Sequence, residues 1–193
     1  LTYRDILSMV DSLGGYLTTT IGWGNECLLL SENTPFFVIA YLAIIKSGNT
    51  ALLVETRISD ESLAGIFHEC NVQATFVQKK YRSKIAKTEN IFTEDILMSP
   101  RHTNEPITHC VGDNDVAVVI FTSGSTGEKK GVMLTHKNLC ANTESIVQYL
   151  NLTSRDRICV TLPFFYCYGA SLLHTHLRAG GSIVLSNNIF LGG

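Results

Sequence analysis

Hydrophobic and polar positions follow a helical period and then a strand-like run over the first 30 residues. Residues 6–17 carry an apolar stripe at helical spacing, and Thr2 with Asp5 three residues later resembles a capping box. The pattern therefore predicts an amphipathic helix. Cys27–Leu30 is a short, continuous apolar run, which is typical of a strand covered on both faces.

The next elements continue the same succession. Pro35 stands where it can open a helix, and Gly48 can end that helix. Thr50–Val54 is predicted to be a strand, Asp60–Cys70 a helix with acidic residues in its first turn, and Ala74–Gln78 a strand. A β-α-β-α-β order predicts an α/β fold, a mostly parallel sheet with helices on both faces.

The rest of the chain has a polar stretch followed by further alternating elements. Residues 79–111 are polar and mixed, and we treat them as a connecting segment. Thr135 is placed to cap a helix. The remaining predicted elements are strands at Val116–Phe121, Val132–Leu134, Ile158–Leu162 and Ser182–Leu185 and a helix at Ser171–Leu177.

Composition narrows the class of protein without naming a partner. The chain has 193 residues, a formal net charge of -2 and 17% charged residues, so it offers no basic stripe for nucleic acid. The longest apolar run, Phe36–Ile45, is about half the roughly 20 residues that a membrane span needs and predicts a buried helix. The six cysteines form no Cys-x-x-Cys pair, which favours a reduced, cytoplasmic protein over one with disulfides.

Both ends of the sequence are interpreted as cuts within a larger protein. The chain begins at Leu1 rather than methionine, and it stops at Gly193 just after a strand-like stretch. We therefore treat residues 1–193 as one truncated unit. A domain cut within its fold exposes apolar surface, so we expect the isolated chain to self-associate.

The string TSGSTGEKKG combines hydroxyl side chains, glycines and lysines directly after a predicted buried strand. Glycines let backbone N–H groups approach an anion, hydroxyls donate further hydrogen bonds, and a lysine offsets charge, so this loop suits a polyphosphate. The alternative is a solvated turn between two strands, but ligand crevices of α/β sheets lie where such strands end. The residues predicted to bind phosphate are Thr122, Ser123, Gly124, Ser125, Thr126, Gly127 and Lys130.

The spacing of the loop excludes two familiar nucleotide motifs. A Walker loop would need glycine five positions after Gly124, where Lys129 stands. The dinucleotide pattern Gly-x-Gly-x-x-Gly would need a glycine at position 122, which is threonine. A phosphotransferase built on a Walker loop is therefore disfavoured.

With this loop, the sequence resembles the adenylate-forming (AMP-binding) superfamily of acyl- and aryl-CoA ligases, luciferases and peptide synthetase adenylation domains. The resemblance continues, in the same order as in that family, over nearly the whole chain. Its other motifs are LTYRDI (1–6), IIKSGNTALLVE (44–55), VMLTHKNLCAN (132–142) and LPFFYCYG (162–169). Two departures stand out: Lys129 replaces a usual proline, and Tyr166 replaces the histidine that many acyl-CoA ligases carry beside the carboxylate pocket.

This resemblance implies the N-terminal part of a ligase domain that joins a carboxylic acid to ATP. The products are an acyl-adenylate and pyrophosphate, and a thiol of CoA or of a carrier protein then takes the acyl group. A carboxylic acid is already ionised at neutral pH, so the step needs alignment and charge stabilisation rather than a general base, and we assign no catalytic residue. The phosphate loop would hold the β- and γ-phosphates with Mg²⁺, whose protein ligand the resemblance places beyond Gly193, as it does the adenylation lysine. The fragment alone is therefore expected to be inactive.

Other polar residues are interpreted as structural, except one. His174 and His176 are two positions apart, so they point to different sides of a helix and do not share a metal. His136 follows a helix cap beside the loop, where it either orients the loop or serves in capping or packing. Cys167 has no base nearby in sequence and is expected to be buried. The resemblance makes Tyr166 a candidate substrate contact. A non-catalytic nucleotide-binding or scaffold relative is the alternative function, and the sequence leaves open which acid and which thiol are used.

Overall fold

The structure is a computed structural model, and it describes residues 1–86, 89–98, 107, 109–123 and 129–186. The helices are α1 (Tyr3–Thr20), α2 (Pro35–Lys46), α3 (Asp60–Glu69), α4 (His136–Leu150) and α5 (Cys167–Ala179), with the short 3₁₀ helices η1 (Lys79–Lys84) and η2 (Glu94–Met98). The strands are β1 (Glu26–Leu30), β2 (Thr50–Val54), β3 (Val72–Val77), β4 (Ile91–Phe92), β5 (Val116–Ser123), β6 (Lys129–Thr135), β7 (Arg157–Val160) and β8 (Ser182–Leu185).

Helix starts are fixed by local side chains, as the sequence predicted. The Thr2 hydroxyl accepts a hydrogen bond from the Asp5 backbone at 3.2 Å, and the Asp5 carboxylate accepts one from the Thr2 backbone at 2.7 Å. Pro35 is the first residue of α2. A second reciprocal pair, Thr135 and Asn138, opens α4. Each cap satisfies backbone N–H groups that a helix cannot pair internally.

Within the described residues, six strands form one sheet in the order β4-β3-β1-β2-β5-β6, and β7 pairs with β8 in a second sheet. All neighbours in both sheets are parallel except β5 and β6, which form an antiparallel hairpin. The predicted mostly parallel α/β sheet is confirmed. The sequence pattern missed one strand, β4, which lies inside the polar stretch 79–111 and pairs with β3 at the sheet edge.

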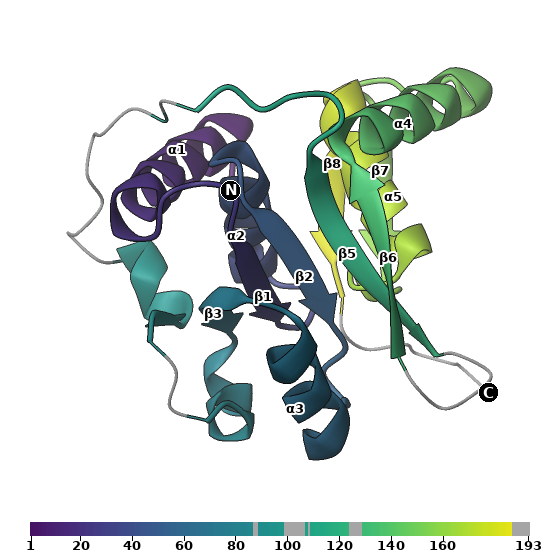
Figure 1. The fold of residues 1–193 in the computed structure, drawn as a ribbon. Coiled ribbons are helices and arrows are strands. Elements are labelled where there is room, and N and C mark those ends of the chain that lie inside the picture. Colours follow the sequence, from purple (N-terminus) through teal and green to yellow (C-terminus); the bar gives the residue numbers. More distant parts are fainter. Residues whose placement is uncertain (87–88, 99–106, 108, 124–128, 187–193) are drawn as a thin grey trace.

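Helices cover both faces of the larger sheet (Figure 1). Because successive strand residues point to opposite faces, Leu29 and Leu53 pack with α1 and α2, whereas Leu28 and Leu52 pack with α3. All four leucines are at most 2% exposed. Neither face of the sheet is in contact with water here, so β1 and β2 are continuous apolar runs in the sequence.

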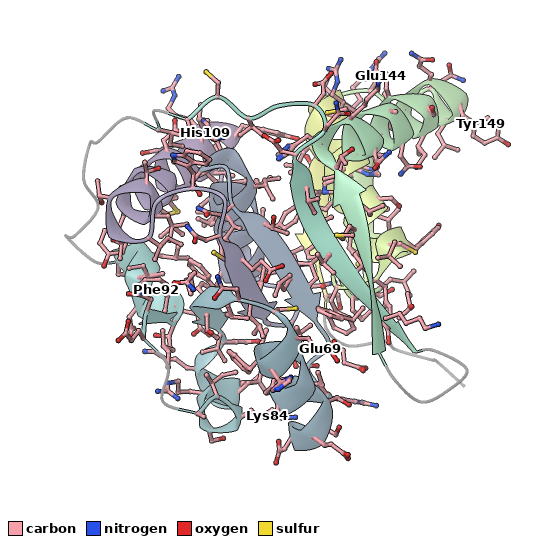
Figure 2. All side chains as sticks on the ribbon, viewed as in Figure 1. Glu69, Lys84, Phe92, His109, Glu144 and Tyr149 are labelled. Carbon is pink, nitrogen blue, oxygen red and sulfur yellow. The ribbon has the colours of Figure 1, made fainter. Side chains whose placement is uncertain are left out.

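The later part of the chain packs against β5, β6 and α2. Helix α4 lies along α5, and Arg178 of α5 donates to the Glu144 carboxylate of α4 at 3.1 Å. The far side of α4 faces outward, and Figure 2 shows Tyr149 at its end pointing away from the rest of the chain, 84% exposed. Phe164, which precedes α5, is fully buried against Phe37 of α2, with ring centroids 5.3 Å apart.

A buried polar pair joins α2 to α5. The Tyr41 hydroxyl and His174 Nε2 are 2.8 Å apart, and the two rings stack with centroids 5.5 Å apart. Burial lowers the pKa of His174 from 6.5 to about 4, so the ring is neutral at pH 7 and shares one hydrogen bond with the Tyr41 hydroxyl. Burial also raises the pKa of Tyr41.

The stability of the protein should decrease in acid because of His174. Below its ordinary pKa of 6.5, the unfolded state binds a proton at this histidine that the folded state does not bind until about pH 4. The contribution of His174 to the free energy of unfolding is therefore fully present above pH 6.5. It is lost as the pH falls toward 4, by at most about 1.4 kcal/mol per pH unit. We expect His174→Gln to flatten this slope in chemical denaturation series. An equally steep slope in His174→Gln would contradict this assignment.

Candidate functional site

The candidate site lies at the carboxyl edge of the larger sheet. Strands β1, β2 and β5 are parallel, so their carboxyl ends at Leu30, Val54 and Ser123 lie at one edge (Figure 1). Thr122, the first residue of the phosphate loop predicted from the sequence, lies near the end of β5 at this edge. Ligands of open α/β sheets bind at the carboxyl ends of strands, so we take this edge as the candidate site.

The β5–β6 hairpin positions two of the predicted phosphate-binding residues side by side. Thr122 and Lys130 pair across the hairpin, the Thr122 hydroxyl donates to the Lys130 carbonyl at 3.4 Å, and both residues are exposed. Opposite residues of an antiparallel pair project from the same face. That face also carries Val118 and Ile120, which pack with α2 and α5. Both residues therefore lie where a ligand at the sheet edge can contact them.

The remaining predicted loop residues are only partly covered by the structure. Ser123 is the last residue of β5, and its side chain is not described. Gly124, Ser125, Thr126 and Gly127 lie outside the described residues. Their phosphate-binding role stays a prediction.

The segment from Leu162 to Gly169 makes a tight turn into α5. The Tyr166 backbone N–H donates to the Pro163 carbonyl at 3.2 Å, and Tyr166 is the residue that precedes α5. A Cβ added at Gly169 would stand 2.0 Å from the Pro163 carbonyl oxygen, so only glycine permits this approach. Tyr166 is 49% exposed, and its ring lies 4.7 Å from that of Phe165. The candidate substrate contact is therefore accessible and its backbone is fixed.

A cavity of about 410 Å³ separates the hairpin from α4 and α5. Its walls include Ile120 of β5, Leu139 of α4, and Cys167 and His174 of α5. The cavity thus connects the strand that carries Thr122 with the helix that follows Tyr166. An apolar hollow with a few polar groups is typical of small-molecule sites.

One side chain, Cys167, differs from its sequence-based interpretation. Cys167 was expected to be buried, but it is exposed because it lies in the first turn of α5 beside the cavity. His174 faces Tyr41, whereas His176 Nδ1 lies 3.0 Å from the Leu172 carbonyl.

Partial burial lowers the pKa of His136. In the part of the chain that the structure describes, no three His, Cys, Asp or Glu side chains form a metal-binding group.

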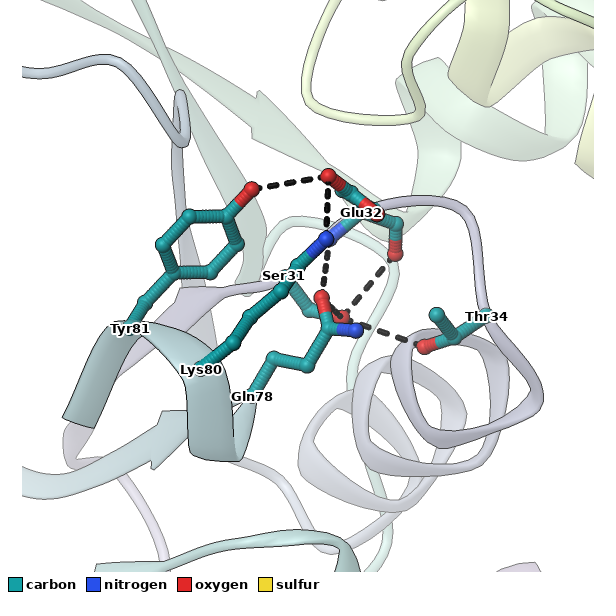
Figure 3. A network of polar contacts seen from close by, with 6 residues as sticks. All are labelled: Ser31, Glu32, Thr34, Gln78, Lys80 and Tyr81. Atoms are coloured by element: carbon teal, nitrogen blue, oxygen red, sulfur yellow. Dashed lines mark hydrogen bonds and ion pairs between the residues drawn. The ribbon is translucent and has the colours of Figure 1, made fainter. Parts of the chain in front are cut away.

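A polar network at the same edge holds the connection between β1 and α2 (Figure 3). Glu32 accepts a hydrogen bond from the Tyr81 hydroxyl at 2.8 Å and pairs with Lys80 at 2.6 Å. These contacts lower the pKa of Glu32 and raise that of Lys80. Gln78 accepts from the Glu32 backbone at 3.1 Å. Sequence reasoning missed this network because its contacts join Glu32 to residues 46 to 49 positions away.

Comparisons with known proteins place the chain in a family. Residues 1–190 match the family described as AMP-binding enzyme. The chain belongs to the AMP-binding enzyme family. The predicted family is confirmed by this match, and the predicted α/β fold is shared with solved structures.

Two relatives of this AMP-binding enzyme chain are themselves ligases. The D-alanine–D-alanyl carrier protein ligase of Listeria innocua is 27% identical over 191 residues, covering 95% of this chain and 38% of that protein. The probable CoA ligase CCL5 of Humulus lupulus is 27% identical over 207 residues, covering 96% of this chain and 37% of that protein. The chain thus spans well under half the length of both ligases.

Solved structures share the fold. ATP-bound MatB from Rhodopseudomonas palustris superposes with a TM-score of 0.87 at 22% identity, covering 97% of this chain and 40% of the MatB chain. At this identity the likeness shows the fold alone. No helix in the described part of this AMP-binding enzyme chain combines the length and hydropathy of a membrane span.

Proposed function

We propose that the protein containing this chain joins ATP to a carboxylic acid, forming an acyl-adenylate and pyrophosphate, and then passes the acyl group to a thiol. The observation that carries the proposal is the pairing of Thr122 with Lys130 beside the predicted phosphate loop, on the face shared with α5. A hydroxyl and an ammonium group there can hold the β- and γ-phosphates, the leaving group of the reaction. Stabilising the departing charge lowers the barrier of such a transfer.

The residues present fit a bound triphosphate. Thr122 is a hydrogen-bond donor and Lys130 a positive charge, and both are exposed at the sheet edge. Glycines at 124 and 127 would let the loop backbone approach the phosphate oxygens. Mg²⁺ bound to those oxygens would offset further charge. We assign no residue of this chain as its ligand.

The acid is proposed to bind beside Tyr166, at the start of α5. The exposed phenol is a hydrogen-bond donor that can orient a carboxylate. The acceptor is proposed to be the thiol of CoA or of a carrier protein. One relative is named a carrier protein ligase and another a probable CoA ligase, so the relatives support both acceptors equally.

Product analysis separates this function from its alternatives. We expect the protein that contains this chain to convert ATP to AMP and pyrophosphate only when a suitable carboxylic acid is added. Formation of ADP would indicate a phosphotransferase. If ATP binds but is not turned over with any acid or thiol, the chain comes from a nucleotide-binding or scaffold relative.

A further inference from the structure

Asn33 joins two parts of the chain that are far apart in sequence. It lies between β1 and α2 at the carboxyl edge of the sheet and is 4% exposed. Its side-chain Nδ2 donates to the Leu162 carbonyl at 2.8 Å, and its Oδ1 accepts from the Phe164 backbone N–H at 2.9 Å. One side-chain amide therefore pairs with the backbone on both sides of Pro163.

This pairing requires asparagine. Pro163 has no N–H, so the backbone around it cannot be held as a regular strand would be. The site needs one donor and one acceptor at short reach, which the asparagine amide supplies and a carboxylate does not. Without the amide, the buried Phe164 N–H would be left unpaired, at a cost of about 1–3 kcal/mol, and the partly buried Leu162 carbonyl would lose its donor.

The held segment determines where Tyr166 stands. The Pro163 carbonyl accepts from the Tyr166 N–H, and the same carbonyl lies against Gly169 in the first turn of α5. A displacement of Leu162–Phe164 would therefore be passed directly to Tyr166. The ring of Phe164, packed on Phe37, further limits other arrangements.

The two residues that flank Asn33 are held in place by contacts of their own. The neighbouring Glu32 is fixed by Lys80 and Tyr81 of η1 (Figure 3). Thr34, on its other side, caps α2 by accepting from the Phe37 N–H at 3.1 Å. Both flanking residues are thus held, and positions held by such supporting contacts can orient a site with high precision.

We propose that Asn33 is a positioning residue for the carboxylic acid. It acts through the Leu162–Phe164 backbone to hold Tyr166 at the distance and angle that the acid needs. This inference rests on the proposed function, because that function places Tyr166 against the acid. A displacement of roughly 1 Å in a group that positions a substrate substantially lowers the efficiency of the reaction.

A second asparagine in the chain supplies a matched control. Asn49 is 1% exposed, its Oδ1 accepts from the Asn25 N–H at 2.9 Å, and its Nδ2 donates to the Gly22 carbonyl at 3.0 Å. It thus makes the same pair of backbone contacts. It lies at the amino edge of the sheet, just before β2, and therefore away from the carboxyl edge.

The test compares Asn33→Asp with Asn49→Asp in the protein that contains this chain. Each change keeps the acceptor, removes the donor and should lower the unfolding temperature similarly. We expect Asn33→Asp to raise the KM for the acid about 10-fold in ATP–pyrophosphate exchange and to leave the KM for ATP within about 2-fold. Asn49→Asp should leave both KM values within about 2-fold. If Asn33→Asp does not fold, Asn33→Ser, which leaves space for a bridging water, should raise the acid KM about 3-fold.

The outcomes separate this inference from the proposed function. Equal effects of the two asparagine changes on the acid KM, with exchange present, would overturn the positioning role and leave the function standing. If the unchanged protein shows no exchange with any acid, the proposed function fails and the positioning role fails with it. A raised KM for ATP in Asn33→Asp would also contradict an effect on the acid side.

Discussion

Replacing Lys130 with alanine in the protein that contains this chain is expected to slow ATP–pyrophosphate exchange by about 10²-fold or more. Lys130 pairs with Thr122 at the end of the β5–β6 hairpin and is exposed beside the predicted phosphate loop. Removing its ammonium group takes away a fixed positive charge from the departing pyrophosphate. That scale is typical of losing one preorganised electrostatic contact in a transition state.

Lys129 provides the control for this prediction. It is adjacent in sequence and pairs with Ser123 rather than Thr122. We expect Lys129→Ala to change the exchange rate little, because the resemblance places it where the family usually has proline. If both changes have equal and small effects, with folding verified by circular dichroism, the assignment of Lys130 to phosphate is wrong.

Gly169→Ala is expected to destabilise the protein by roughly 3 kcal/mol, a large effect for one methyl group. The added Cβ would stand 2.0 Å from the Pro163 carbonyl oxygen and 3.0 Å from the Leu162 carbonyl oxygen. Both neighbours are backbone atoms, which cannot rotate away as a flexible side chain would. The turn would have to open, and α5 would shift relative to the sheet. The unfolding free energy from chemical denaturation measures the loss.

Gly65 is the matched glycine for this experiment. It also lies inside a helix, α3, but an added Cβ would meet no atom within 4 Å. Because alanine favours a helix over glycine by about 1 kcal/mol, Gly65→Ala should be neutral or stabilising. A similar small effect at Gly169 would show that the turn at Pro163 is less tightly packed than the structure indicates.

Much of the fold could be predicted because its signals are local. The cap at Thr2, the proline that opens α2 and the apolar runs of β1 and β2 each involve a few neighbouring residues. The edge strand β4 was missed because it has only two residues and pairs with a single neighbouring strand. A pattern of two residues is too short to indicate a strand. Helix α5 begins at Cys167, four residues before its predicted start, because the aromatic run before Ser171 gives no helical period of its own.

For the candidate site, too, the residues with a local sequence signal could be predicted and the others could not. Lys130 and Thr122 could be named from one short string, the structure places them opposite each other in the β5–β6 hairpin, and their phosphate-binding role stays a prediction. The contacts of Asn33 with the Leu162–Phe164 segment had no sequence signal, because they join positions about 130 residues apart through one side chain. Cys167 was placed wrongly for a related reason: its exposure depends on how α5 meets the hairpin, and no local pattern contains that information.

The most direct test of the central claim is ATP–pyrophosphate exchange by the protein that contains this chain, measured against a panel of carboxylic acids. Exchange of labelled pyrophosphate into ATP requires a reversible attack of the acid on the α-phosphorus, so it reports acyl-adenylate formation and no other ATP reaction considered above. We predict exchange that depends on one or a few acids and is reduced about 10²-fold in Lys130→Ala. Exchange absent with every acid, from a folded protein that binds ATP, would contradict the account.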